Sequence, residues 1–328
     1  MSYHHLTLEE RECILVLHSH QLSNRNIALR LNRNPSTISR ELHRLSGEYS
    51  ACAAEDDYHA CRSRSHKPSI LSRKPDLREI IVDLILNHHW SPEQIAVRLK
   101  MEKVADVSYN TIYRDIERDN LGLPFTSHGD TGIRRQLRRK GHRQHPKGVR
   151  RHAAPQVTYI PISERPNFIN RRLRIGDWEL DTVLGKVGEE VLVTLVERKT
   201  RFSLIGKAKH KDPESVNKVV VKLLRSIPKE FVHSITPDHG VEFLHLSEVA
   251  AELAITVYWP KPYSPQQRGT NENTNGLIRD YFPRNQFIKI HTDDEVHQCQ
   301  VDLNLRPRKV LGFQSPSEVL FDKVLHLV

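Results

Sequence analysis

The feature that most constrains the fold of this chain is a change of hydrophobic pattern near residue 166. After that point three apolar segments follow one another, GDWELDTVLGK, EVLVTLVERKTR and FSLIGKAKHK. The first alternates apolar and acidic positions and the second is a continuous apolar run, which are two patterns typical of strands. Before residue 120, apolar residues recur at helical spacing behind capping residues. The sequence therefore predicts all-α domains followed by a domain built on a sheet.

The order of elements after residue 166 predicts the topology of that sheet. Three antiparallel strands come first, and Asp212 and Pro213 then start an amphipathic helix. A fourth strand ends at Asp238, and a helix, a fifth strand and two more helices complete the chain. This order predicts an α/β, ribonuclease-H-like core, a mixed five-stranded sheet with flanking helices.

The first 45 residues have the pattern of a helix-turn-helix. Thr7 and Ser23 can cap two helices, and Pro35 suits the first turn of a third. Ala28 is the small residue that lets neighbouring helices cross closely, and Asn32 tolerates the left-handed backbone of the turn. The third helix would expose polar groups to a DNA major groove: Ser36, Thr37, Ser39, Arg40 and His43.

A second segment repeats this pattern. Ser91 caps a helix that opens with Pro92, and Ser108 caps a further helix that would expose Asn110 and Arg114. A three-helix bundle without a ligand is the alternative interpretation of either segment. Two such segments in tandem favour recognition of an extended DNA site.

A basic tether links the two halves of the chain. No acidic residue occurs between Thr131 and Ser163, and the net charge of the whole chain is +10. Such a block extends along an anion or remains a solvated linker, and its position between two DNA-oriented parts favours contact with DNA phosphates. The residues that we expect to make these contacts are Arg134, Arg135, Arg138, Arg139 and Lys140.

Three acidic residues fall at the ends of elements of the expected sheet domain: Asp181, Asp238 and Glu272. Three carboxylates that converge can hold two divalent cations for phosphoryl transfer, and oxygen ligands favour Mg²⁺ or Mn²⁺. Each acid also has an ordinary explanation, since Glu272 suits the start of a helix. By the same reasoning Asp177 and Glu179 would be solvated, and Glu242 would be a surface charge.

Longer sequence blocks carry a resemblance to a known family. GDWELDTVLG, LVTLVERKTRFSLI, TPDHGVEF and PYSPQQRGTNENTNGLIRDYFP resemble the signature blocks of the insertion-sequence-thirty family of bacterial transposases, which are Asp-Asp-Glu enzymes with an integrase-like core. Between Asp238 and Glu272 lie 33 residues, the interval typical of that family. LTLEERECI, STISREL and WSPEQIAVRL resemble its front end. The family usually has Asn in place of His239 and Trp in place of Gln266 or Gln267.

The resemblance implies the catalytic and metal-binding triad Asp181, Asp238 and Glu272, with two Mg²⁺ or Mn²⁺ ions. It also implies binding to terminal inverted repeats of an insertion sequence, followed by strand cleavage and strand transfer. The expected partners are double-stranded DNA, at the element ends and the target, and further copies of the chain, at least a dimer on paired ends. A DNA-binding regulator with an inactive catalytic domain and a nuclease without joining activity are the alternatives.

Domain bounds and location follow from the same patterns. An apolar run of the length of a membrane span is absent from the sequence, so we expect no membrane partner and a bacterial cytoplasmic protein, associated with the nucleoid through DNA. The expected division is a helix-turn-helix domain at 1–45, a linker at 46–75, a second helix-turn-helix domain at 76–120, a basic linker at 121–165 and the catalytic domain at 166–328.

Overall fold

The computed structural model describes residues 4–64, 68–127, 129–137, 160–186, 190–260 and 269–328. The chain forms two compact units, Met1–Arg73 and Lys74–Val328, each described by itself below. Within the described residues, every helix is too short or too polar to cross a membrane.

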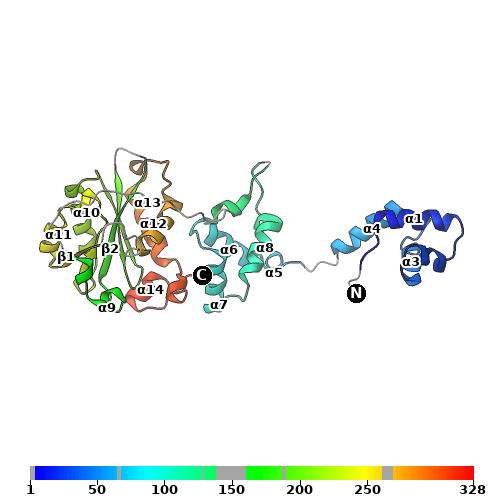
Figure 1. Cartoon of the computed structure of the whole chain (residues 1–328), viewed down its shortest axis with the longest axis horizontal. Helices are drawn as coiled ribbons and strands as arrows, with labels where there is room; N and C mark the ends of the chain where they lie inside the picture. Colours follow the sequence, from blue (N-terminus) through cyan, green and yellow to red (C-terminus); the bar gives the residue numbers. More distant parts are fainter. Residues whose placement is uncertain (1–3, 65–67, 128, 138–159, 187–189, 261–268) are drawn as a thin grey trace. The chain divides into compact units, whose positions relative to one another are not determined.

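The first unit is all-α (Figure 1). The expected caps are confirmed, since Thr7 forms a capping box with Glu10 and the side chain of Ser23 accepts a hydrogen bond at the start of the second helix. Ala28 is buried and Asn32 has a φ of 51°, as a helix-turn-helix requires. The helices are α1 Leu8–Ser19, α2 Asn24–Arg30, α3 Pro35–Leu42, α4 Ala51–Arg64 and α5 Ile70–Arg73.

The interior of this unit contains a charge that the sequence pattern did not predict. Leu8 and Leu15 of α1 are exposed although they are apolar, whereas Arg11 is buried. Arg11 forms ion pairs with Glu41, at 2.8 Å, and with Glu55 of α4. A buried guanidinium persists when it is paired in this way. The segment 46–75, expected to be a linker with a partial helix, contains α4, which packs on α1.

The second unit begins with a helical part. Its helices are α6 Pro75–Leu86, α7 Pro92–Met101 and α8 Tyr109–Asp119, followed by the short 3₁₀ turns η1 Asn120–Gly122 and η2 Gly132–Gln136. Ser91 forms a capping box at the start of α7, as its sequence predicts. The turn η2 lies in the expected basic linker, yet it is anchored, because Ile133 is buried and its N–H donates to Asn120 Oδ1 at 2.7 Å.

The rest of the second unit is built on one six-stranded mixed sheet in the order β1-β6-β5-β2-β3-β4. Strands β2, β3 and β4 are antiparallel neighbours, whereas β5 runs parallel to β2, β6 to β5, and β1 to β6. The strands are β1 Ile160–Pro161, β2 Asp177–Leu184, β3 Val191–Glu197, β4 Ser203–Ala208, β5 Ser234–Thr236 and β6 Thr256–Trp259. This is the ribonuclease-H-like arrangement, with β1 as an edge strand beyond the five expected.

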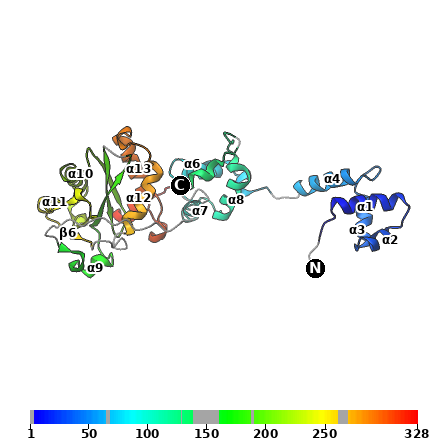
Figure 2. The same cartoon turned by 45° about the horizontal axis from the view of Figure 1, so that its top comes forward.

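Helices cover both faces of the sheet. Figures 1 and 2 show α10 (Pro213–Arg225) and α11 (Leu246–Leu253) on one face, and α12 (Gly269–Tyr281) and α13 (Asp293–Leu305) on the other. A short α14, Pro316–Phe321, follows α13, so the described residues after β6 contain three helices where two were expected. The remaining short helical segments are α9 Asn167–Asn170, η3 Ile162–Glu164, η4 Lys229–Phe231, η5 Val241–Phe243, η7 Ile288–Ile290 and η8 Lys309–Leu311.

The two faces of β2 bury different groups. Trp178 and Leu180 belong to the apolar core under α10 and α11, while Val183 packs with residues of α12 and α13. Because side chains alternate along a strand, Asp181 lies on the face that α12 covers. The fold thus places this acid between the central sheet and α12.

Candidate functional site

One pocket of about 700 Å³ brings the end of β2 together with α12. Asp181 and Glu272 both line it, although they come from different parts of the sequence. The whole lining is Asp181, Thr182, Val183, Asn271, Glu272, Asn275, Gly276, Arg279, Pro283 and Arg284. Two of the three expected acids therefore share one site.

Neighbouring groups orient the carboxylate of Asp181. Asn275 of α12 donates from Nδ2 to Asp181 Oδ2 at 2.9 Å, and the N–H of Thr182 donates to Oδ1 at 2.8 Å. Thr194 on β3 donates to the backbone carbonyl of Asp181 at 3.2 Å and to Asn275 Oδ1 at 3.3 Å. Strand β3, strand β2 and helix α12 thus fix the half-buried carboxylate together.

Asp238 lies two residues beyond the end of β5. Strands β5 and β2 are paired with Thr236 opposite Glu179, so the same register continued by two residues would bring Asp238 opposite Asp181. Paired strands lie about 4.8 Å apart. Asp238 is not among the residues that line the pocket, and its Oδ1 accepts from the N–H of His239 at 2.6 Å.

Glu272 is exposed and lies in the first turn of α12. The residue before it is fixed to the sheet, because the N–H of Asn271 donates to Glu179 Oε2 at 3.3 Å. Across the described part of the chain, no three His, Cys, Asp or Glu side chains are grouped so as to hold a metal ion. The structure thus brings Asp181 and Glu272 into one pocket, whereas Asp238 follows the end of the adjacent strand β5 and is not in the lining of that pocket.

The three acids that the sequence suggested to be solvated or on the surface are buried. Asp177 is paired with Arg174 at 2.8 Å, and Glu179 with Arg198 at 2.5 Å. Glu242 lies 3.2 Å from a lysine amine and accepts from Thr182 Oγ1 at 2.9 Å. That expectation was wrong because strand alternation does not show that helices cover both faces of the sheet.

Two arginines of the pocket, Arg279 and Arg284, were missed by the sequence analysis. Burial lowers the pKa of Arg279, and the nearby positive charge of Arg284 lowers it further. Arginine side chains carry a positive charge in proteins. Two like charges at one site favour an anion between them. Helical periodicity could have indicated Arg279, which follows Glu272 by two turns and so shares its face of α12.

The ring of His239 contacts a backbone carbonyl. Its Nε2–H donates to the oxygen of Pro260 at 2.7 Å, and the ring lies 6.3 Å from that of Trp259. The resembled family usually has Asn at this position, whose amide can also donate a hydrogen bond. The structure shows that the ring still donates one hydrogen bond, to a backbone oxygen.

The expected DNA-binding residues of α3 lie on its outer side to different extents. Ser36, Arg40 and His43 are exposed, whereas Thr37 and Ser39 are half-buried. Arg40 Nε donates to the backbone oxygen of Ser36 at 3.1 Å, within its own helix. The guanidinium therefore has no role in packing that would prevent it from turning toward DNA.

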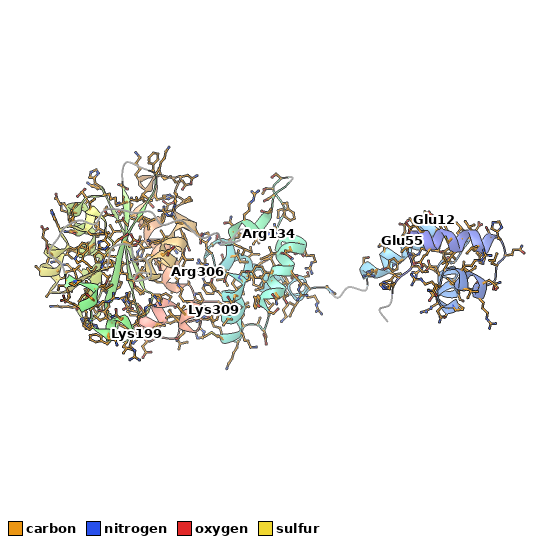
Figure 3. All side chains as sticks on the ribbon, viewed as in Figure 1. Glu12, Glu55, Arg134, Lys199, Arg306 and Lys309 are labelled. Atoms are coloured by element: carbon orange, nitrogen blue, oxygen red, sulfur yellow. The ribbon has the colours of Figure 1, made fainter. Side chains whose placement is uncertain are left out.

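The second helical segment presents a similar surface on α8. Asn110 and Arg114 are exposed there, beside the partly exposed rings of Tyr109 and Tyr113, whose centroids are 6.5 Å apart. Arg134 and Arg135 are exposed on η2, and Figure 3 labels the first of them. Arg138, Arg139, Lys140 and Gln266 lie outside the described residues.

These features define a class of two-part proteins. A helix-turn-helix with an exposed polar third helix, a motif that binds DNA, is joined to a ribonuclease-H-like sheet domain that carries carboxylates and arginines in one pocket. A family model described as a helix-turn-helix domain matches residues 2–45. The catalytic core domain of BIV integrase is similar over 45% of this chain and 95% of its own, at 17% identity and a TM-score of 0.36.

Relatives over nearly the whole length identify the family. The transposase InsI of insertion sequence element IS30A from Escherichia coli K12 is 37% identical and aligns over 96% of this chain and 83% of its own. The transposase of element IS4351 from Bacteroides fragilis is 34% identical over 96% of this chain and 94% of its own. The chain belongs to the IS30 family of insertion-sequence transposases.

Proposed function

We propose that this transposase binds the terminal inverted repeats of its own element and catalyses cleavage and joining of DNA strands with the help of divalent cations. The observation that carries the proposal is the shared pocket of Asp181 and Glu272, beside Arg279 and Arg284. Carboxylates that ligate cations and arginines that bind phosphates are the two groups that phosphoryl transfer on DNA requires.

The donor set of this site suits Mg²⁺ or Mn²⁺. Asp181 and Glu272 offer carboxylate oxygens, and Asn275 and Thr182 add neutral polar groups to the lining. Such oxygen ligands favour hard cations over zinc. Asp181, Asp238 and Glu272 would together hold two ions. Bound cations supply activation of the attacking water or 3′-hydroxyl and stabilisation of the leaving oxygen.

The residues of the chain have separate roles in this proposal. Asn275 and the N–H of Thr182 hold the carboxylate of Asp181 in one orientation. Arg279 and Arg284 would bind the phosphates that flank the reacting bond. Arg279 is half-buried and Arg284 exposed, so the pair lies at the entrance to solvent from which DNA would arrive.

Recognition of the element ends belongs to the helical parts. Helix α3 would enter a major groove with Ser36 and Arg40, and α8 would enter another with Asn110 and Arg114. The basic residues between the two halves would add phosphate contacts: Arg134, Arg135, Arg138, Arg139 and Lys140. We further propose that at least two copies assemble on paired ends, and that the protein acts in the bacterial cytoplasm, where its DNA is.

A regulator with an inactive catalytic domain is the second candidate. The observation in its favour is that the described acids do not form a group of three. Carboxylates that repel one another separate when cations are absent, so the same observation is also expected of an active enzyme.

A single experiment separates the candidates. The DNA that flanks the gene supplies the element ends, which are offered to the full chain as labelled duplexes with Mg²⁺, Mn²⁺ or a chelator. An active transposase cleaves the ends and joins them to a target only with a cation. A regulator binds the ends and leaves them intact, and a nuclease cleaves them without joining.

A further inference from the structure

Helix α7 of the second helical part is fastened to the C-terminal segment of the chain. Arg98 of α7 is only 2% exposed. Its guanidinium donates to Glu318 of α14 at 3.0 Å, to Glu102 at 2.6 Å and to the backbone oxygen of Leu325 at 2.8 Å. A guanidinium so deeply buried needs these partners, because an unpaired charge in such a place is strongly unfavourable.

The two carboxylates beside Arg98 also hold the final residues. Glu102 accepts from the N–H of Leu327 at 3.0 Å and from that of Val328 at 3.2 Å, and Glu318 accepts from the N–H of Leu325 at 3.1 Å. We call Arg98, Glu102, Glu318 and the segment Leu325–Val328 the C-terminal clamp. The clamp joins two elements that are far apart in the sequence.

A second group of contacts lies near the start of α7. Arg306 Nε donates to Gln94 Oε1 at 3.2 Å, and Lys309 lies 2.6 Å from the carboxylate of Glu93. Figure 3 labels Arg306 and Lys309, which come from the segment between α13 and α14. Because α7 is held by contacts at both of its ends, it cannot easily rotate about the contacts at one end alone.

Helix α8 keeps its outer face open in this arrangement. The contacts with the C-terminal part come from α7 and from His88 and His89 before it, while Tyr109, Asn110 and Arg114 of α8 stay exposed. In a helix-turn-helix the second helix contacts the base edges and the first supports it. Fixing α7 to the sheet domain therefore leaves the proposed recognition surface accessible.

We propose that the C-terminal clamp holds the helical part α6–α8 in a fixed position on the catalytic part, so that the protein sets the distance between the DNA segment bound by α8 and the pocket of Asp181 and Glu272. Arg98 is then a positioning residue for cleavage. This consequence for cleavage rests on the proposed function, whereas the fixed attachment of the helical part can be tested without it.

Hydrogen–deuterium exchange of the full chain tests the attachment. The C-terminal peptide should exchange at least ~10-fold more slowly than an unstructured peptide, because its N–H groups are bonded to buried carboxylates. Arg98→Ala should remove this protection, and the matched control Lys100→Ala, an exposed position on the same helix, should keep it. Fast exchange in the unaltered protein overturns the proposal, and so does unchanged protection in Arg98→Ala. If α8 also loses protection in Arg98→Ala, a variant that lacks Leu325–Val328 is used in place of Arg98→Ala. In that variant α7 should lose protection, and unchanged protection of α7 overturns the proposal.

A cleavage assay tests whether the protein sets the distance between the DNA segment bound by α8 and the pocket of Asp181 and Glu272. Five extra base pairs, about half a helical turn, are placed between the segment that α8 protects in a footprint and the element end. The unaltered protein and Lys100→Ala should cleave this substrate at the natural end at least ~10-fold less than the native one. Arg98→Ala should cleave both within about two-fold of each other. Equal cleavage of both substrates by the unaltered protein contradicts a fixed distance. Failure to cleave either substrate contradicts the proposed function, and the exchange result then decides on the attachment alone.

Discussion

The buried ion pair Glu179–Arg198 should be a major determinant of the stability of the sheet domain. Glu179 is 0% exposed and Arg198 5%, and their charged groups are 2.5 Å apart. Glu179→Gln removes one charge and leaves the other buried without its partner. Removing one member of a buried pair costs about 3–5 kcal/mol, whereas replacing both by apolar residues is often neutral.

The expected loss can be converted into a melting temperature. In a unit of this size each kcal/mol lowers Tm by roughly 2–4 °C, so Glu179→Gln should lower it by roughly 6–20 °C. Thermal unfolding of the full chain measures the change. The matched control is Glu214→Gln, since Glu214 forms an ion pair of 2.7 Å with Lys218 on the surface of α10. Such exposed pairs contribute about 0–1 kcal/mol.

The double variant Glu179→Leu, Arg198→Met removes both charges of the buried pair. It should recover most of the stability that Glu179→Gln loses, because neither charge remains buried. The reasoning is refuted if Glu179→Gln lowers Tm no more than Glu214→Gln, or if the double variant Glu179→Leu, Arg198→Met is less stable than Glu179→Gln.

Three further changes test other parts of the account. Arg40→Ala should weaken binding to the element end by about 1–3 kcal/mol in a titration of the full chain, and equal weakening on random DNA would contradict base reading. The hydrogen bond from Arg33 lowers the pKa of Glu10, so its contribution to stability is present above pH 4.5 and is lost as pH falls through the lowered pKa. Glu10→Gln should therefore cost up to about 1 kcal/mol in chemical unfolding at neutral pH and progressively less as pH falls below 4.5, and a constant difference would exclude this linkage. His239→Asn should change cleavage by less than about three-fold, because either side chain can donate the one hydrogen bond, and a gain of orders of magnitude would mark this chain as impaired.

Local chemistry explains why the helical termini could be predicted from the sequence. Thr7, Ser91 and Asp212 cap their helices as expected, because a cap depends on a few adjacent residues. The five main strands were also predictable, since an alternating or continuous apolar run has few other ways to be buried. The edge strand Ile160–Pro161 was missed because two residues carry no periodicity.

Charged groups show where the sequence was insufficient. Arg11, Glu179 and Glu242 have the composition of surface residues, yet all three are buried and paired with groups far away in the sequence. Such pairing depends on which helices and strands pack together, and a local sequence pattern does not indicate this. The same holds for Arg98, whose partners lie in the last residues of the chain. The pocket of Asp181 could be anticipated only through the strand ends and the resemblance to the family.

Single amide substitutions of the three proposed metal ligands test the central claim most directly. Asp181→Asn, Asp238→Asn and Glu272→Gln are compared with the unaltered protein for Mg²⁺-dependent cleavage of the element ends, with binding to the same DNA measured in parallel. Glu214→Gln serves as the surface control. The account predicts that each of the three abolishes cleavage and joining while binding stays within about two-fold, because each removes a ligand charge and leaves α3 and α8 intact. Cleavage that survives in any one of the three variants would contradict it.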